Sequence, residues 1–479
     1  MAMLGQGGWR CRGAVVLAAA LAAGCMRLGN FRADVAASRE AAIAAWERAR
    51  AGEPDGTRPS IRGELSLEAA QVLAMGNNKQ LLAALQEKLF ASGRLTEAWA
   101  ALYPTATLTG SYRRVDEVSG FTIGPQKVTI GGLDNYAFNL ALQQPVFSGG
   151  AIQSGIRAAR VYALIADEGV RSAVQAILFQ VRKAYYDVLL AAELARVSES
   201  DLELAKRHLA DVEKKLKAGT AREYDVLRAR VEITNVEAEL ITRQDAERLA
   251  TAQLLRHLGV AQDSDVSLTG KLAHEPVSPE LAGAVAAAFR RRPELLLAEL
   301  AIRAQNEALR GARAGWFPFL SLFANATYTK PDPHDAMRNK WGDAWDAGAS
   351  LAWTLFDGFR TTGRVRQERA RLRQAEIALL DAEEQVLLEI QQALLSIEDA
   401  EKLVRSQSAN IERAREGLRL AEVGYKAGAA TEIEVLDARQ ALSRTQALFY
   451  QALYAHTMAR LLLEKATGAL EQPAEGAPK

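Results

Sequence analysis

The chain has 479 residues, and its 59 basic side chains nearly balance its 58 acidic ones. This balance gives no indication of a nucleic-acid-binding surface or of an acidic tail. Charged residues make up 24% of the chain, and after the N-terminal segment no apolar run reaches about 18 residues, which excludes a transmembrane helix in the mature protein.

Residues 1–24 are predicted to be a secretory signal peptide. Arg10 and Arg12 precede a short apolar run, Ala14–Ala23, which is followed by Gly24 and Cys25. The segment resembles a bacterial lipoprotein box, although its leucine lies four residues before the cysteine instead of the usual three. We expect acyl chains on Cys25 that anchor the protein in a membrane. The alternative is ordinary cleavage nearby, which leaves Cys25 as a plain thiol or removes it.

Residues 25–65 are interpreted as an N-terminal anchor and linker segment. An alanine-rich amphipathic helix is expected at Phe31–Arg50, and the Pro- and Gly-containing stretch Glu53–Pro59 is typical of a linker. From Ser66 a longer helix is predicted to run to about Ala101, because apolar residues recur with helical spacing and a proline follows at position 104.

Four segments alternate apolar and small polar residues and are the strand candidates of the chain. They are Thr105–Tyr112, Tyr136–Gln143, Phe319–Tyr328 and Trp345–Leu355. One apolar face opposite one polar face fits the wall of an outer-membrane β-barrel, with aromatic residues near the strand ends at Tyr112, Tyr136, Trp345 and Trp353. The alternative is two soluble hairpins covered by helices. Four strands cannot close a barrel alone, so several chains must share it.

One long helix is predicted to follow each pair of strands. Apolar and small residues recur at alternating spacings of four and three across Val170–Leu216, and the same pattern returns 209 residues later across Leu379–Tyr425. A period of 3.5 residues over six heptads is typical of helices wound into a left-handed supercoil. The first long helix, 148–218, would be about 105 Å long.

The chain is therefore expected to contain two copies of one unit of helix, two strands, long helix and second helix. The second helices are expected at about Ala221–Leu258 and Glu432–Thr467, and each shorter helix pair would match the length of one long helix. The predicted divisions are a first repeat at 66–262, a connector at 263–279, a second repeat at 280–468 and a C-terminal tail at 469–479.

A helix-turn-helix hairpin is predicted at the C-terminal end of each long helix, and its turn is called a tip here. Lys217 and Lys426 occupy the last turns, and Gly219 and Gly428 suit a left-handed C-cap. The next helices are expected to begin with the capping boxes Thr220-x-x-Glu223 and Thr431-x-x-Glu434.

An acidic pair follows the second tip. Glu434 and Asp437 are three residues apart and so share one helical face. In a bundle of several chains the pair would repeat around the axis as a ring of carboxylates. The alternative is that Glu434 only caps the helix and that Asp437 is a solvated surface charge.

The duplicated layout resembles the TolC family of trimeric outer-membrane channels over residues 66–468. The most specific fragments are Lys-Ala-Gly-Thr-Ala-Arg-Glu-Tyr-Asp-Val-Leu at 217–227 and Gly-Tyr-Lys-Ala-Gly-Ala-Ala-Thr-Glu-Ile-Glu-Val-Leu-Asp-Ala at 424–438. Supporting fragments are Leu-Tyr-Pro at 102–104, Trp-Phe-Pro at 316–318, Pro-Val-Phe-Ser-Gly-Gly at 145–150 and Leu-Phe-Asp-Gly at 355–358.

The resemblance implies a mainly α-helical fold with a membrane β-barrel. Three chains would form a twelve-stranded barrel, four strands per chain, on an α-helical periplasmic tunnel. It also implies a periplasmic gate at Glu434, Asp437 and Tyr425. The residues expected to contact a periplasmic adaptor protein are Lys217, Ala218, Gly219, Thr220, Lys426, Ala427, Gly428 and Ala429. Where the family often has a basic or hydrogen-bonding residue after the second tip glycine, this chain has Ala429 and Ala430.

The function that follows is a passive exit duct in the bacterial outer membrane. It would serve a tripartite efflux pump as a lipid-anchored homotrimer that docks on an adaptor and an inner-membrane transporter. The alternatives are the duct of a type I protein secretion system and a periplasmic coiled-coil scaffold without a pore. No enzyme, cofactor or metal is expected, because the five histidines, at 208, 257, 274, 334 and 456, show no metal-ligand spacing.

Overall fold

The computed structural model describes residues 31–50, 59–277, 279–335 and 337–470. They belong to two compact units, a smaller one that ends at Glu64 and includes Val260–Ser267, and a larger one that contains the rest. Cys25 and the signal peptide lie outside the described residues, as do most of the predicted linker and C-terminal tail. Among the described residues, none of the helices combines the length and the apolar character needed to cross a bilayer.

The smaller unit contains helix α2 (Phe31–Arg50), as expected from the sequence, and a short two-stranded ribbon. The ribbon pairs β1 (Arg62–Leu65) with β6 (Asp265–Leu268). Both strands were missed by the sequence analysis, which expected only linker residues there. They have four residues each, too few for the alternation of apolar and polar side chains to be recognised.

Two helices of equal length organise the larger unit, as the 209-residue repeat predicts. Helices α5 (Ala151–Lys217) and α9 (Arg360–Lys426) each contain 67 residues. The predicted heptad positions form their cores: the buried ones include Ile177, Val181, Ala184, Val188, Ala195 and Val212 in α5, and Val386, Ile390, Ala393, Ile397, Ala400 and Val404 in α9. The seam is rich in alanine, which lets neighbouring helices approach closely.

The predicted helix from Ser66 to Ala101 is in fact two helices, α3 (Leu67–Asn77) and α4 (Lys79–Ala100). Asn78 breaks it, because its backbone is extended and its side-chain oxygen caps α4 by accepting from the amides of Gln80 and Leu81. The same break recurs 214 residues later, where Arg292 separates α7 (Leu281–Arg291) from α8 (Pro293–Arg313). There Pro293 suits the first helical position and disfavours helix at the preceding residue.

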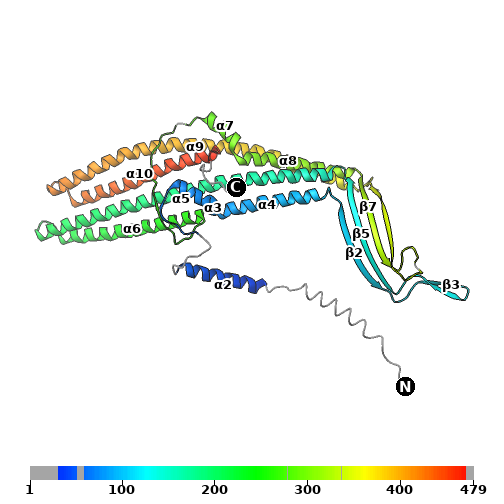
Figure 1. The fold of residues 1–479 in the computed structure, drawn as a ribbon. Coiled ribbons are helices and arrows are strands. Elements are labelled where there is room, and N and C mark those ends of the chain that lie inside the picture. Colours follow the sequence, from blue (N-terminus) through cyan, green and yellow to red (C-terminus); the bar gives the residue numbers. More distant parts are fainter. Residues whose placement is uncertain (1–30, 51–58, 278, 336, 471–479) are drawn as a thin grey trace, which may run out of the picture. The chain divides into compact units, whose positions relative to one another are not determined.

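The shorter helices pack along the long ones. Helices α3, α4 and α6 (Glu223–Leu258) contact α5, while α7, α8 and α10 (Glu432–Ala466) contact α9. A one-turn 3₁₀ helix, η1 (Ala314–Trp316), follows α8. Because α10 also packs against α5, the two hairpins form one layer in the order α9, α10, α5, α6 (Figure 1).

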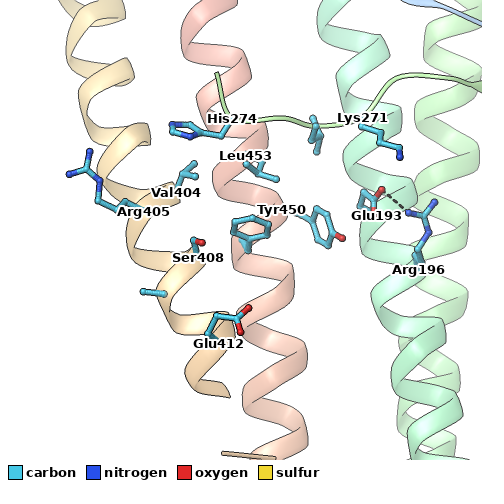
Figure 2. A pocket seen from close by; sticks show the side chains of 13 residues that line it. Glu193, Arg196, Lys271, His274, Val404, Arg405, Ser408, Glu412, Tyr450 and Leu453 are labelled. Atoms are coloured by element: carbon cyan, nitrogen blue, oxygen red, sulfur yellow. Dashed lines mark hydrogen bonds and ion pairs between the residues drawn. The ribbon is translucent and has the colours of Figure 1, made fainter. Parts of the chain in front are cut away.

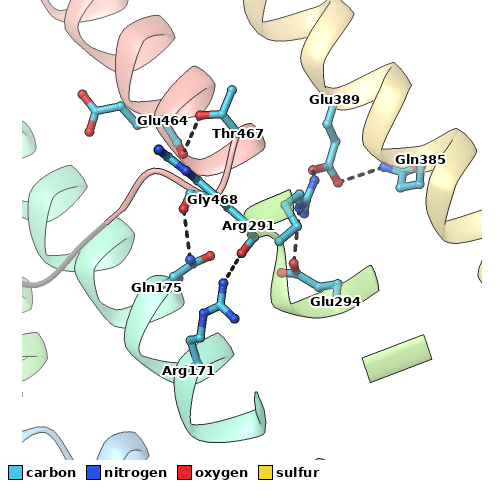
Figure 3. Close-up of polar contacts among 10 residues, drawn as sticks. Arg171, Gln175, Arg291, Glu294, Gln385, Glu389, Glu464, Thr467 and Gly468 are labelled. Carbon is cyan, nitrogen blue, oxygen red and sulfur yellow. Dashed lines mark hydrogen bonds and ion pairs between the residues drawn. The ribbon is translucent and has the colours of Figure 1, made fainter. Parts of the chain in front are cut away.

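Polar contacts attach the α7–α8 break and the end of α10 to the long helices (Figure 3). Arg171 on α5 donates to the backbone carbonyl of Arg291, and Gln175 donates to that of Gly468 at 3.3 Å. The buried guanidinium of Arg292 binds Glu389 on α9 at 2.5 Å and Glu294 at 3.2 Å. The buried Arg292 thus fixes the break relative to α9, and Arg171 fixes it relative to α5.

A four-stranded antiparallel sheet lies at the N-terminal ends of α5 and α9. Its strands follow the order β2 (Thr105–Arg114), β5 (Asp134–Phe147), β7 (Phe319–Lys330) and β8 (Gly342–Ala352). All four strands were predicted. The register aligns one apolar row, Leu108, Leu140, Ala326 and Trp345. The next row on the other face is Thr107, Ala141, Asn325 and Asp346.

The apolar face of this sheet is exposed in the described chain. Leu108 is 72% exposed, Trp345 79% and Leu351 66%. The alternative in which helices of the same chain cover two soluble hairpins is therefore wrong. A further hairpin, β3 (Gly120–Ile123) with β4 (Gln126–Thr129), extends the β2–β5 connection and was not predicted.

Candidate functional site at the hairpin tips

The first tip, residues 217–222, joins α5 to α6. Gly219 has φ of +75°, the left-handed cap that was predicted, and its amide donates to the carbonyl of Leu216 at 2.9 Å. The predicted capping box at Thr220 is wrong. The hydroxyl of Thr220 instead donates back to the carbonyl of Lys215, and α6 begins after Arg222, whose amide donates to the Asp225 carboxylate at 2.9 Å.

The second tip, residues 426–431, joins α9 to α10. Gly428 has φ of +76°, and the amide of Ala429 donates to the carbonyl of Gly424 at 2.8 Å. Here the predicted capping box is confirmed. The amide of Glu434 donates to the Thr431 hydroxyl at 3.4 Å, and the Glu434 carboxylate accepts from the Thr431 amide at 3.3 Å.

All eight residues predicted to contact an adaptor are exposed. They are Lys217, Ala218, Gly219, Thr220, Lys426, Ala427, Gly428 and Ala429. A Cβ atom at Gly219 or Gly428 would meet no atom of a non-adjacent residue within 4 Å, so the restriction on these two positions comes from their positive φ. The backbone of each tip is thus held by capping hydrogen bonds, while its side chains are exposed.

Two of the three predicted gate residues are exposed acids on the first turns of α10. Glu434 combines this exposure with its capping role, and Asp437 lies one turn further along the same face. Their structural equivalents 209 residues earlier are Asp225 and Arg228. Only the second tip therefore presents two acids on this face.

The third predicted gate residue, Tyr425, is partly buried against α5. The ammonium of Lys215 lies 3.3 Å from the centre of its ring, a cation–π contact that joins the two hairpins within one chain. Burial, followed by the negative charge of Glu432, raises the pKa of the Tyr425 hydroxyl, so it stays protonated and can donate a hydrogen bond.

A buried polar cluster behind Tyr425 was missed by the sequence analysis. His208 on α5 is only 5% exposed, and its Nε2 lies 3.3 Å from the Glu432 carboxylate on α10. Burial, followed by the positive charge of Arg439, lowers the pKa of His208 to about 4. The ring is therefore neutral at pH 7, and its hydrogen bond to an ionised Glu432 requires the proton on Nε2.

Arg439 completes this cluster between α5 and α10. Its guanidinium lies 4.0 Å from Glu422, and its Nε and Nη1 atoms are buried without a hydrogen-bond partner among the described residues. Burial lowers the pKa of Arg439 and raises the pKa of Asp201 on α5. The sequence predicted no partner for His208. Its partners come from the other repeat, 224 residues away, so no spacing within α5 could reveal them.

Comparison with known proteins identifies the family. The sequence pattern of outer membrane efflux proteins matches residues 71–260 and 284–469, which are the two repeats. The chain belongs to the outer membrane efflux protein family. The predicted TolC-type resemblance is confirmed, and with it a place in the outer membrane. As an efflux protein it is a transport duct and not an enzyme.

Individual relatives cover most of the chain. The pyoverdine export outer membrane protein OpmQ of Pseudomonas aeruginosa is 27% identical over 94% of this chain and 96% of its own length. The alkaline protease secretion protein AprF of the same species is 26% identical over 84% of each. The Campylobacter jejuni CmeC outer membrane channel has the same fold, with a TM-score of 0.74 at 17% identity over 86% of this efflux protein and 87% of CmeC.

Proposed function

We propose that three copies of this efflux protein close into one outer-membrane duct, through which small molecules leave for a tripartite pump. The observation that carries the proposal is the open four-stranded sheet. Within the described chain β2 pairs only with β5 and β8 only with β7, so both edges are unpaired while one face is apolar and exposed. Open edges are not tolerated in lipid, and three such sheets joined edge to edge give twelve strands without any edge.

The helical layer supports the same closure. Within one chain, α5 packs against α10 and joins the two repeats, but α6 and α9 lie at opposite ends of the layer (Figure 1). Tyr224, Leu227, Val231 and Ile241 on α6 follow heptad spacing and are all exposed. A ring of three chains would cover this stripe with α9 of the next chain, so that the contact between repeats is repeated between chains.

The two tips are the surfaces proposed for docking on a periplasmic adaptor, which would link the duct to an inner-membrane transporter. Gly219 and Gly428 present matching turns with the same sign of φ, and three chains would display six such turns around one axis. Repeated small turns offer a hairpin partner the same local shape at each position.

Glu434, Asp437 and Tyr425 are proposed to form the gate. In a ring of three chains, Glu434 and Asp437 would bring six carboxylates to one constriction, whose field favours cations and retards anions. Tyr425 would hold the second hairpin against the first through Lys215, with its hydroxyl available to a neighbouring helix.

Lipid attached to Cys25 is proposed to anchor the N-terminus in the outer membrane. Two or more acyl chains hold a protein stably without a transmembrane helix. Mass spectrometry of the N-terminal peptide tests this. We expect lipid mass on the wild type and none on Cys25→Ser, whereas identical lipid-free peptides would contradict the anchor.

Duct formation can be tested with cysteines at the sheet edges. Ala106 on β2 would be replaced by cysteine together with one of Ala347, Ala349 or Leu351 on β8. Within one chain β2 and β8 are separated by two strands, or about 14 Å, which is too far for a disulfide. Any disulfide must therefore join two chains.

We expect at least one pair to give a covalent trimer on denaturing gels, and the single-cysteine variants to stay monomeric. The absence of cross-links at all three β8 positions, or a ladder that stops at dimer, would contradict the ring. Ion conductance of the purified trimer in planar bilayers then separates a duct from a coiled-coil scaffold without a pore.

The second candidate function is the duct of a protein secretion system. The similarity to AprF, whose name records secretion of an alkaline protease, favours it. Cross-linking in cells followed by identification of the inner-membrane partner distinguishes the two functions, because a secretion duct would be captured with a transporter that carries a polypeptide.

A further inference from the structure

A cluster of two histidines and one glutamate lies away from the tips, halfway along the second hairpin. His274 belongs to the strap, defined here as residues 269–277 between β6 and α7, while Glu401 is on α9 and His456 on α10. One ligand atom from each of these residues lies within 4.8 Å of the other two. Figure 2 shows the strap crossing the long helices with His274 over α9 and α10.

The most informative member is His456. Its side chain is fully buried at 0% exposure, and neither ring nitrogen has a hydrogen-bond partner within the described part of the chain. A neutral imidazole has one donor and one acceptor nitrogen, and burying both unpaired is unfavourable unless something else satisfies them. Its nearest aromatic neighbour is His274, with ring centres 4.7 Å apart and the rings steeply inclined.

The strap is already held in place next to this histidine. The amide of Val277 donates to the Glu401 carboxylate at 3.2 Å, and Glu275 pairs with Arg460 on α10. Glu401 is therefore oriented toward the strap by a contact that does not involve either histidine. This arrangement resembles the outer contacts that orient carboxylate ligands in metal sites.

His274 provides access from solvent. Its side chain is exposed, and it lines a groove of about 890 Å³ together with Lys271, Leu272 and Tyr450. An ion could therefore enter from the groove and reach the buried ring of His456 behind it. The cluster has one closed side and one open side, as a site with an exchangeable ligand requires.

We propose that His274, Glu401 and His456 bind a divalent transition-metal ion of the zinc type. Two imidazole nitrogens and one carboxylate oxygen suit such an ion and leave a fourth position for water. Around zinc, bond lengths near 2.0–2.1 Å place ligand atoms about 3.3 Å apart, so the cluster must contract by roughly 1.5 Å at most. Rotation of the exposed His274 side chain can supply that movement while Glu275 and Val277 keep the strap in place.

The bound ion would fasten the strap, which links the two repeats, to both helices of the second hairpin. This inference goes beyond the efflux duct and does not depend on trimer formation. Binding to the folded state alone would stabilise it in proportion to the metal concentration. The duct would then respond to available metal through the packing of its own helices.

The test uses the untagged full-length protein in detergent, freed of metal with a chelator and titrated with Zn²⁺ by calorimetry. We expect one ion per chain. His274→Ala removes an exposed ligand without disturbing the core, and Glu401→Gln keeps an acceptor for Val277. Each is expected to weaken binding at least about tenfold, the minimum loss seen when even outer contacts of a metal site are removed. The matched control is His257→Ala, on helix α6, which should bind as the wild type does.

Cobalt gives an independent readout. Co²⁺ in a four-coordinate site with nitrogen ligands absorbs visible light, and we expect this band in the wild type and in His257→Ala but not in His274→Ala. Zinc should also raise the melting temperature of the wild type and leave that of His274→Ala unchanged. The proposal is overturned if the wild type binds no stoichiometric zinc, or if His274→Ala binds it equally well.

Discussion

The two tips of this efflux protein have nearly the same backbone but different chemistry. Each long helix has 67 residues and ends in a lysine, followed two residues later by a glycine of positive φ. After the turn they diverge: Arg222 and Arg228 at the first tip correspond to Thr431 and Asp437 at the second. The two repeats thus share the shape of the hairpin and differ in the charges that follow the turn.

The two repeats also differ in how much of their surface the chain itself covers. Helix α5 packs against α3, α4, α6, α8 and α10, so it is central to the layer, whereas the main packing partners of α9 in the described chain are α7, α8 and α10 of its own repeat. The exposed apolar stripe on α6 and the outer face of α9 are therefore the surfaces that remain for a neighbouring chain. The contact between α5 and α10 within one chain has the same arrangement as the contact proposed between α9 and α6 of neighbouring chains.

The largest expected effect, on trimer formation, comes from disrupting the exposed apolar stripe on α6. Val231→Glu places a carboxylate on the α6 stripe, where an unpaired buried charge costs more than about 3 kcal/mol. We expect a folded chain by circular dichroism but loss of trimer by light scattering in detergent. The matched control is Ala246→Glu, an exposed site of α6 off this stripe, which should assemble normally. A trimeric Val231→Glu protein would remove α6 from the proposed interface.

The next effect concerns the charge difference between the tips. Asp437→Arg gives the second tip the charge of its first-tip equivalent, and Arg228→Asp makes the reciprocal change. We expect Asp437→Arg to reverse or abolish cation selectivity in planar bilayers, as should Glu434→Gln combined with Asp437→Asn in a milder form. Arg228→Asp should leave selectivity nearly unchanged. Equal effects from both reciprocal variants would show that the gate does not reside in the acidic pair.

A smaller effect, on the stability of the tips, is expected when the pH is lowered, because His208 lies in the buried polar cluster. Burial and the charge of Arg439 lower the pKa of His208 to about 4, while an unfolded histidine titrates near 6.5. The folded chain thus binds fewer protons between these values, and packing of α5 on α10 loses stability as the pH falls, by about 2 kcal/mol at pH 5. The raised pKa of Glu432 opposes this change, and Asp211 and Lys215 are the other charges nearby.

Hydrogen exchange measured at pH 7 and pH 5 checks this prediction. After correction for intrinsic rates, tip amides of the wild type should be less protected at pH 5, and His208→Gln should remove most of that difference. His334→Gln, on an exposed loop, is the control and should behave as the wild type does. An unchanged pH response in His208→Gln would mean that other groups control the tip.

The smallest effect on stability is expected where the tips are alike. Gly219→Val and Gly428→Val each force a side chain into positive φ at about 1–2 kcal/mol, and a Cβ atom at either position would have open space around it. We expect both variants to form trimers at normal levels but to lose binding to the adaptor hairpin in a surface-binding assay. Failure of either variant to assemble would instead give its glycine a role in folding.

Periodicity in the sequence was sufficient to predict the large elements. The 3.5-residue spacing over Val170–Leu216 and Leu379–Tyr425 predicted α5 and α9 and placed their C-terminal ends within one residue, although each helix begins 19 residues earlier. The alternation located all four strands of the main sheet. Both patterns are repeated many times. Short elements escaped prediction: Asn78 breaks a helix through one side-chain cap, and β1 and β6 are four residues each.

The capping box at Thr220 failed for a local reason. Both turns have three residues between the glycine and the next helix, but Thr431 is the last of the three and Thr220 is the first. The Thr220 hydroxyl therefore faces the end of α5 instead of the start of α6. The motif Thr-x-x-Glu identifies a helix start only when the threonine directly precedes it.

By itself, the sequence determined the duplicated helical layout, the exposed tips and the efflux family, since each depends on patterns that are local and repeated. Only the tertiary structure decided which polar residues meet. His208 and Glu432 are 224 positions apart, and His274 meets Glu401 and His456 from a strap between two repeats. Such contacts arise from packing one element against another, and residues brought together across helices have no fixed spacing along the chain.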